Sequence, residues 1–236
     1  MNQFAMAFTP DKLEEAWHVF LTEFPLGLWE TVYVTVLATL FAIVIGLPLG
    51  ILLVTGDEKG IKPMPGLLMK VINVIINFLR SVPFLILIVM VIPLTRAIIG
   101  TSIGSVASIV PLVVAAFPFV ARLVESSLRE LDPYIIEMAQ SMGSSTWQII
   151  TRVMLPESVP SLVTNFTLAI TTILGYTAMS GAMGGGGLGK IAINYGYSRY
   201  KYAVLYLAVI VLVLLVQIFQ TIGTRLAARL DKRIKR

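Results

Sequence analysis

Five long stretches of the sequence are almost free of Asp, Glu, Lys and Arg, and they constrain the fold more than any other feature. A helix needs about 20 apolar residues to cross a bilayer core. Each stretch reaches that length, although the second contains Arg80 and the fourth, with 32 residues, is too long for one crossing. The fourth is expected to form a helix over roughly 160–180, followed by a glycine-rich loop over 181–201. The stretches are Thr31–Gly56, Val71–Thr95, Ala97–Ala121, Ser158–Gly189 and Tyr202–Thr224.

The composition is that of a membrane protein and excludes several kinds of chemistry. Apolar residues make up 57% of the 236 residues and charged residues 13%, whereas soluble domains carry about 25% charged residues. The chain has no cysteine and one histidine, His18. We therefore predict no disulfide, no Cys nucleophile and no metal centre based on Cys or His. None of the stretches alternates as a membrane β-strand does. We therefore predict an all-α integral membrane protein, a single domain over 1–236 with five transmembrane helices.

The distribution of Lys and Arg predicts the orientation of the chain. With five spans, the loops at 56–70 and 122–157 and the tail at 225–236 lie on one side and hold 12 of the 18 basic residues. The opposite side holds five. Because basic loops stay in the cytoplasm, the N-terminus is expected outside and the C-terminus inside. The basic tail at 225–236 is expected to contact anionic lipid headgroups.

Residues 1–27 are expected to form an extracytoplasmic segment with a helix in the membrane interface. Thr9 suits the N-cap position and Pro10 the first helical position. Apolar residues then recur at helical spacing up to Phe24, and the helix should end near Pro25. The segment lacks the basic start and apolar core of a signal peptide.

Gly184–Lys190 matches the pattern of a phosphate-binding P-loop, but the context is wrong. Ile191 follows where a P-loop needs Ser or Thr, and no strand is expected before the glycines. We interpret this run as a turn at the outer side whose glycines can adopt positive φ angles. The chain is therefore expected to bind no nucleotide.

The inner loop at 128–157 predicts two short helices that meet at a glycine. Asp132 is a favoured N-cap residue, and Pro133 suits the first position of a helix. Gly143 is placed to end this helix. Ser145 begins the spacing of a capping box for the second helix.

The first of these helices is amphipathic, and its apolar face is expected to be exposed. This face could lie against lipid or dock a soluble partner. Leu155-Pro156 is expected to close the second helix. The residues of the face are Ile135, Met138, Ala139 and Met142.

The loop resembles the EAA motif, E-A-A-x₃-G-x₉-I-x-L-P, of permease subunits in bacterial ABC importers. Its spacing matches at every fixed position, with Met138 for the second alanine and Val153 for the isoleucine. The resemblance implies that this loop is a coupling helix seated in a cleft of an ATPase subunit. Glu137 is expected to meet a basic or hydrogen-bonding group on the ATPase. The alternative is that Glu137 is an ordinary acidic residue on the helix surface. The implied coupling residues are Glu137, Met138, Ala139, Gly143, Leu155 and Pro156.

The resemblance extends from about residue 28 to the end of the chain. Arg80–Pro83 resembles an element of amino-acid permeases, and Gly100–Gly104 and Gly175–Gly189 look like the methionine-importer subfamily. The implied fold is that of a type I ABC importer permease in the bacterial cytoplasmic membrane. The implied function is import of an amino acid by alternating access, with methionine (L or D) as the expected substrate. Another amino acid or related small solute is the alternative.

The resemblance also implies an assembly. It consists of a homodimer of this chain, two ABC ATPase subunits that bind ATP-Mg, and an extracytoplasmic substrate-binding protein. Five helices are too few both to enclose a translocation path and to flank it. A homodimer would supply ten, and cyclic dimers are the commonest oligomers. The chain itself is expected to hold no catalytic residue, cofactor or metal, and to bind no nucleic acid.

Polar residues inside the spans are candidates for the translocation path or gate, because they are costly in lipid. Arg80 could recognise a carboxylate, or reach the inner interface as a structural side chain. Met179 could meet its copy in a dimer as a gate, or simply pack. The tentative path or gate residues are Arg80, Asn77, Asn165, Tyr176 and Met179.

Three other classes of membrane protein fit less well. A secondary transporter would show an inverted repeat and buried acids, and a channel a selectivity filter. A membrane enzyme would need a cluster of catalytic side chains. No span carries an acid at its middle, and five spans do not divide into two equal halves. The sequence also shows no selectivity filter and no cluster of catalytic side chains.

Overall fold

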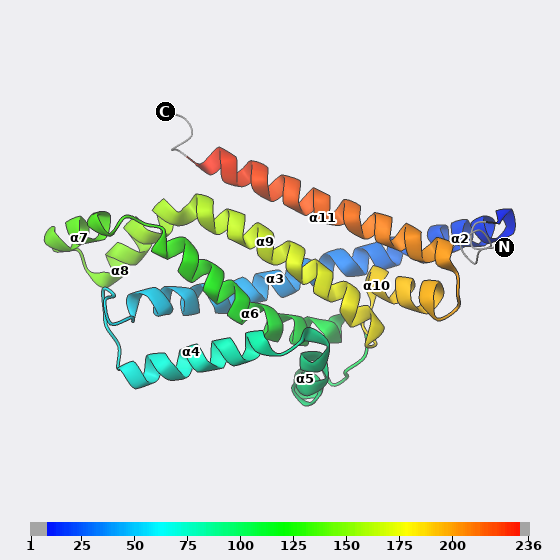
Figure 1. Cartoon of the computed structure of the whole chain (residues 1–236), viewed down its shortest axis with the longest axis horizontal. Coiled ribbons are helices and arrows are strands. Elements are labelled where there is room, and N and C mark those ends of the chain that lie inside the picture. Colours follow the sequence, from blue (N-terminus) through cyan, green and yellow to red (C-terminus); the bar gives the residue numbers. More distant parts are fainter. Residues whose placement is uncertain (1–8, 232–236) are drawn as a thin grey trace. The chain divides into compact units, whose positions relative to one another are not determined.

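The computed structural model describes residues 9–231, and this part of the chain is helical with no strand (Figure 1). The all-α prediction is therefore confirmed. The helices are α2 (Pro10–Thr22), α3 (Phe24–Thr55), α4 (Gly66–Ser81), α5 (Phe84–Ile99), α6 (Ser105–Arg129), α7 (Pro133–Ser141), α8 (Thr146–Ile149), the π-helix η1 (Ile150–Met154), α9 (Leu155–Ala182), α10 (Gly187–Ile191), the π-helix η2 (Ala192–Tyr197) and α11 (Tyr202–Leu230).

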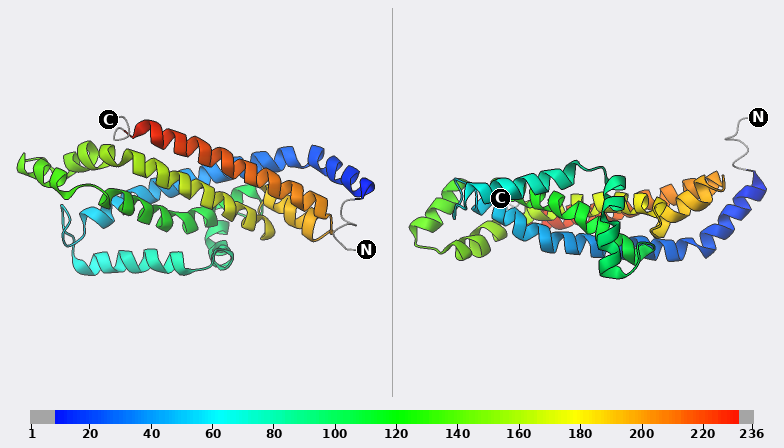
Figure 2. Two further views of the ribbon diagram at one scale, coloured as in Figure 1. Left: turned by 45° about the horizontal axis from the view of Figure 1, so that its top comes forward. Right: turned by 90° about the horizontal axis from the view of Figure 1, so that it is seen from below.

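Four helical segments are long and apolar enough to cross a membrane, and a fifth candidate is an interrupted pair. The pair is α4 and α5, which the sequence predicts as one span over Val71–Thr95. The helix instead stops at Ser81, because Val82 is extended (φ −76°, ψ 126°) before Pro83. A residue before proline is pushed out of the helical region. Arg80 therefore lies in the last turn of α4, and the interruption can be followed in Figure 2.

The first two helices meet closer to the N-terminus than predicted. Thr9 and Pro10 begin α2 as expected, but α2 ends at Thr22 and α3 begins at Phe24. Pro25 thus lies in the first turn of α3 and ends no helix. Proline is tolerated there because its missing N–H would have no partner within the helix.

The glycine-rich region after residue 180 is more helical than the sequence predicts. The helix expected over 160–180 runs over Leu155–Ala182, and only 183–186 separate it from α10 and η2. Most of the segment 181–201, expected as a glycine-rich loop, is therefore helical. Leu155-Pro156 likewise opens α9 and does not close the second short helix, α8, which ends at Ile149.

The chain divides into two compact units. Unit 1 comprises Met1–Thr39, Pro83–Val113 and Ile170–Ile218. Unit 2 comprises Leu40–Val82, Val114–Ala169 and Phe219–Arg236. Helices α3, α6, α9 and α11 contribute residues to both.

Unit 2 is held together by close packing of its parts of α3, α4 and α6. Leu53, Met69, Ile76 and Ala121 form a buried cluster. Gly50 lies so near α6 that a Cβ there would overlap Val124 and the carbonyl oxygen of Ala121. Small residues allow helices to approach in this way inside membranes.

Gly50→Val is expected to lower the thermal unfolding midpoint of the detergent-solubilised protein, because α3 and α6 would be forced apart. Overpacking of this kind costs about 1–3 kcal/mol. Gly66→Val is the matched control, since a Cβ at Gly66 has nothing within 4 Å. Equal midpoints for the two variants would show that this contact does not stabilise unit 2.

Candidate functional site

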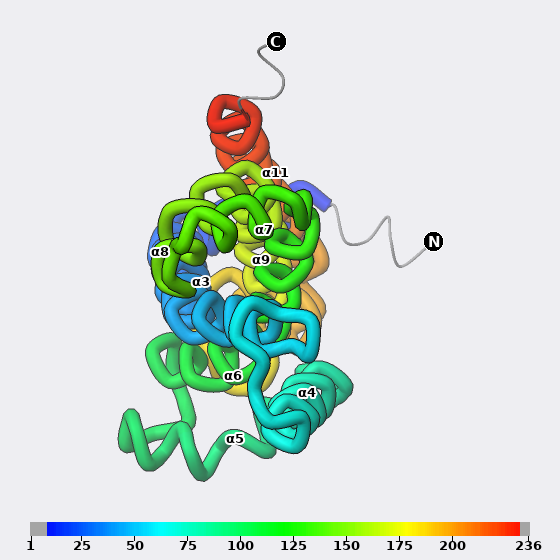
Figure 3. Tube along the Cα trace, turned by 90° about the vertical axis from the view of Figure 1, so that its left-hand side faces the viewer, coloured from blue at the N-terminus to red at the C-terminus, as the bar shows by residue number. Residues whose placement is uncertain are grey.

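The loop at 128–157 folds into a helical hairpin with the predicted caps. Asp132 Oδ1 accepts a hydrogen bond of 3.0 Å from the backbone N–H of Tyr134, at the start of α7. Gly143 follows the end of α7 with φ +77°, a conformation that glycine adopts at little cost. The capping box is complete, because Ser145 N–H donates to Gln148 Oε1 (2.9 Å) and Gln148 N–H to Ser145 Oγ (3.4 Å). Both short helices lie beside one another facing the viewer in Figure 3.

The apolar face predicted for α7 is partly buried within the hairpin and partly exposed. Ala139 is buried, whereas Met138 and Met142 are 59% and 79% exposed. Since α7 contacts α8 and η1, part of its apolar surface is used within the hairpin. Tyr134 and Trp147 join the two methionines on the outside. Tyr134, Met138, Met142 and Trp147 are called the hairpin surface below.

The hairpin runs into α9 without a break in helical backbone. Ile150, which caps α8, and Leu155, which caps η1, both have right-handed helical backbone angles. Pro156 is exposed and Leu155 half-buried, both in the first turn of α9. A displacement of α8 can therefore reach α9 through a continuous helix.

A second group of contacts holds the start of the hairpin. Arg129 Nη2 pairs with Asp57 Oδ2 at 2.9 Å and with Glu125 Oε1 at 3.0 Å. The hydrogen bond from Arg129, with one from the backbone N–H of Glu58, holds the pKa of Asp57 below its ordinary value. Exposed Glu137 lines a groove of about 520 Å³ that Asp57 and Arg129 also line.

Asn77 accepts a hydrogen bond from Arg122, a contact that the sequence analysis did not predict. Arg122 Nη2 donates to Asn73 Oδ1 (2.7 Å) and Asn77 Oδ1 (3.0 Å), and Arg122 Nη1 pairs with Glu125 Oε2 at 2.6 Å. In the sequence Arg122 is only the first charge after an apolar run. Arg80 is exposed on α4, and no hydrogen bond or ion pair joins it to another residue of 9–231.

The remaining candidates for the path or gate have separate surroundings. Asn165 Nδ2 donates to Ser127 Oγ (2.7 Å) and to the carbonyl oxygen of Leu123 (3.2 Å), which ties α9 to α6. The ring of Tyr176 stacks on Phe84 with centroids 4.4 Å apart. Met179 is 48% exposed near the end of α9.

The glycine-rich segment binds a carboxylate of the chain itself. Glu30 Oε2 accepts a hydrogen bond of 2.7 Å from Gly187 N–H, and Thr31 Oγ1 one of 2.9 Å from Leu188 N–H. A Cβ on Gly186 would overlap Glu30 Oε2 and Ser105 Oγ. Two of the backbone amides that a P-loop would offer to phosphate, those of Gly187 and Leu188, are thus used inside the fold, as expected for a structural turn.

Comparison with known proteins links this architecture to one family of transporters. A family model described as "Binding-protein-dependent transport system inner membrane component" matches residues 46–236. The chain is 44% identical to the probable D-methionine transport system permease protein MetI of Vibrio cholerae serotype O1, over 87% of this chain and 91% of that protein. It is 45% identical to the D-methionine transport system permease protein MetI of Escherichia coli K12, over 66% of this chain and 71% of that protein.

Solved structures show the same fold. The chain matches one from the MetNI methionine ABC transporter in an inward-facing conformation, with a TM-score of 0.85 and 43% identity over 87% of this chain and 95% of that one. It also matches a chain of an amino acid ABC transporter, with a TM-score of 0.69 at 18% identity over 96% of this chain and 100% of that one. The second likeness concerns the fold alone.

Proposed function

Because the chain belongs to the binding-protein-dependent transport system inner membrane component family, we propose that it is the permease of an ATP-driven importer that carries methionine into the cell. One observation carries this proposal. The capped hairpin at 132–149, with Gly143 at its turn, occurs in a chain over 40% identical to permeases named for D-methionine transport. Another amino acid or a related small solute is the second candidate, favoured by the resemblance of Arg80–Pro83 to an element of amino-acid permeases.

The proposed assembly supplies what the chain lacks for active transport. Two copies of this chain would enclose the path, and two ATPase subunits would bind ATP-Mg and dock on the hairpins. A substrate-binding protein would deliver methionine from outside, where the N-terminus is proposed to lie. The chain would span the inner membrane, with its C-terminus in the cytoplasm.

The hairpin surface is the part of the chain best suited to contact the ATPase. It presents four large, exposed side chains, two of them methionines, which adapt their shape to a cleft. Exposed Glu137 lies on the same short helix and can meet a basic or hydrogen-bonding group of the ATPase. Ala139, by contrast, would serve the hairpin's internal packing.

Coupling then follows from helical continuity. When the ATPases close on ATP, the docked hairpins move, and Leu155 and Pro156 carry this movement into the first turn of α9. The permease would switch between inward- and outward-open states as a set of rigid parts. Met179 and Tyr176 are proposed to line the path or gate. Arg80 is proposed to lie on the path as well, whereas the contacts of Asn77 and Asn165 suit structural roles beside it.

Uptake of labelled L- and D-methionine into proteoliposomes tests the function. The vesicles hold this chain with its ATPase and binding protein, with and without internal ATP. We expect uptake that requires ATP and is competed by unlabelled methionine. ATP-dependent uptake of another amino acid alone would favour the second candidate, and uptake independent of ATP would contradict an ABC importer.

Gly143→Val is expected to uncouple transport from ATP hydrolysis. A Cβ at Gly143 meets no atom within 4 Å, so the substitution acts only through the positive φ angle, which β-branched residues avoid. Gly143→Asn is the matched control because Asn tolerates this conformation. The measurement is methionine transported per ATP hydrolysed, with thermal unfolding to confirm folding. We expect a loss of about tenfold for Val, corresponding to about 1.4 kcal/mol, and near-normal coupling for Asn. Full coupling in both would remove the hairpin from the mechanism.

Met179→Ala is expected to raise the leak of methionine across vesicles that lack ATP, because a gate would lose a flexible apolar side chain. Met90→Ala is the control, since Met90 is exposed to a similar extent (47%) on α5. A leak that is unchanged in Met179→Ala would assign Met179 to packing.

A further inference from the structure

Helix α4 has few apolar contacts that hold it in place. Of its 16 residues, Met69 and Ile76 are buried, in a cluster with Leu53 and Ala121. Apolar residues on the opposite side of α4 are exposed. In a chain that spans a membrane, lipid tails are as apolar as these side chains, so apolar surface alone does not drive a helix onto its neighbours. The position of α4 therefore depends on its packing and on polar contacts.

Neither end of α4 continues into another helix. Residues 56–65 before it are not helical, and the backbone of Val82 after it is extended before Pro83. Unit 2 also ends at Val82 in this part of the chain. A movement of the hairpin can enter α9 through continuous helical backbone, but it cannot reach α4 in this way.

Arg122 on α6 supplies the polar contact that α4 needs. Its Nη2 donates to Oδ1 of Asn73 at 2.7 Å and to Oδ1 of Asn77 at 3.0 Å, and these two residues lie one turn apart on α4. Asn73 Nδ2 donates to the carbonyl oxygen of Met69 at 2.8 Å, which leaves Oδ1 for the arginine. Among residues 9–231, Arg122 is the only residue outside α4 that forms a hydrogen bond or ion pair with an α4 side chain.

The guanidinium group of Arg122 is itself fixed by charged neighbours. Arg122 Nη1 pairs with Glu125 at 2.6 Å, and the two side chains are 21% and 14% exposed. Glu125 pairs in turn with Arg129, which pairs with Asp57. Two positive and two negative charges balance in this group, so α4 has to supply only neutral acceptors. The planar guanidinium can bond to α4 through one nitrogen and to Glu125 through another.

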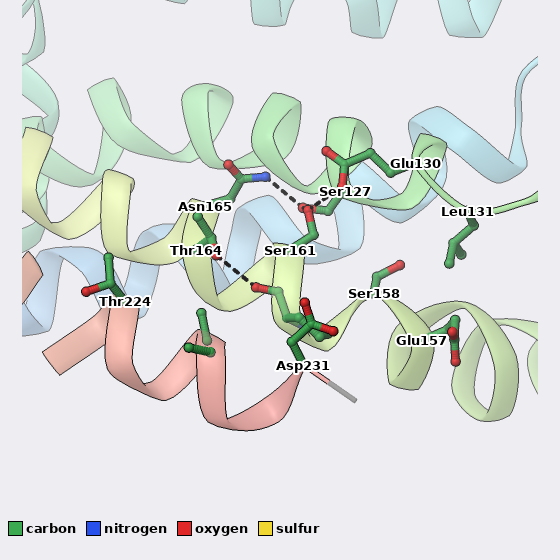
Figure 4. A pocket seen from close by; sticks show the side chains of 13 residues that line it. Ser127, Glu130, Leu131, Glu157, Ser158, Ser161, Thr164, Asn165, Thr224 and Asp231 are labelled. Atoms are coloured by element: carbon green, nitrogen blue, oxygen red, sulfur yellow. Dashed lines mark hydrogen bonds between the residues drawn. The ribbon is translucent and has the colours of Figure 1, made fainter. Parts of the chain in front are cut away.

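The same end of α6 is also bonded to α9 (Figure 4). Asn165 Nδ2 donates to Ser127 Oγ at 2.7 Å, and Ser161 Oγ donates to Glu130 Oε2 at 2.8 Å. All four residues belong to unit 2, as do Arg122 and α4. Polar contacts within unit 2 therefore connect α9 to α6 and α6 to α4.

We propose that Arg122 is a positioning residue that fastens α4 to α6, so that α4 moves together with the hairpin and α9 during transport. The inference rests on the proposed function and adds a second route by which the hairpin moves the membrane-spanning part of the chain. Asn77 then acts by holding α4 through Arg122 and not by contact with the substrate.

Spin labels in the assembled transporter test whether α4 is fastened. They are placed at Val74→Cys on α4 and Leu168→Cys on α9, two exposed positions in a chain without cysteine. The labelled chain is diluted with unlabelled chain, so that distances within one protomer are measured. We expect a narrow distance distribution that is the same with and without ATP. Replacing both Asn73 and Asn77 by Leu, which has a similar shape but no acceptor, is expected to broaden it.

Methionine transported per ATP hydrolysed is measured on the same variants without labels. Asn73→Leu with Asn77→Leu is expected to lower this ratio about tenfold, the order of effect of losing hydrogen bonds to a charged group. Asn73→Leu with Asn77→Asp is expected to restore most of it, because Asp returns an acceptor to Arg122. The single change Asn77→Leu is expected to give a smaller loss, and it decides the question if the double Leu variant does not fold. Ser81→Ala is the control, since Ser81 Oγ bonds only within α4.

Three results would overturn the proposal. An equally narrow distribution after loss of both asparagines would show that Arg122 does not hold α4. A distance that changes with ATP in the unaltered chain would show that α4 moves separately from α9. A loss of coupling that Asn77→Asp does not restore would show that the acceptor is not what matters. If the unaltered transporter imported no methionine, the proposed function would fail, whereas the distances would still decide whether Arg122 holds α4.

Discussion

The packing of unit 2 depends on the ion pairs of Glu125 as well as on the apolar contacts of α3, α4 and α6. The two carboxylate oxygens of Glu125 pair with Arg122 and Arg129, and these arginines reach on to α4 and to Asp57. The carboxylate is only 14% exposed, so removing one partner would leave a charge poorly compensated. The cluster joins α4 and the loop after α3 to the end of α6, where the hairpin begins. The hairpin is thereby mounted on a fixed base at one end and on α9 at the other.

The features predicted correctly are those that depend on neighbouring residues. The caps at Asp132 and Ser145 and the end of the first short helix beside Gly143 follow from residue type and spacing over a few positions. Prolines were harder to interpret, because the same residue can end one helix or begin the next. Pro25 and Pro156 both begin helices, whereas Pro83 separates two.

The residues missed by the sequence interpretation are paired across long separations. Arg122 lies 45 to 49 positions from the two asparagines that it binds, and Glu30 is 157 positions from Gly187. No periodicity within one segment encodes such pairs. The family resemblance located the hairpin, but it could not show that Ala139 is buried while Met138 is exposed. The structure therefore separates residues that share a motif into those suited to docking and those suited to internal packing.

We propose that the hairpin and the unit 2 part of α9 move as one rigid lever when the ATPases of the proposed assembly close. The chain has no cysteine, so spin labels can be placed at Ser141→Cys on α7 and Leu168→Cys on α9 without background labelling. Pulsed electron spin resonance then measures distances with and without ATP in the assembled transporter. A rigid lever predicts an unchanged distance between the two labels of one protomer and a changed distance between the Leu168→Cys labels of the two protomers. A change within the protomer would instead show that the hairpin hinges on α9, which would contradict the proposed route of coupling.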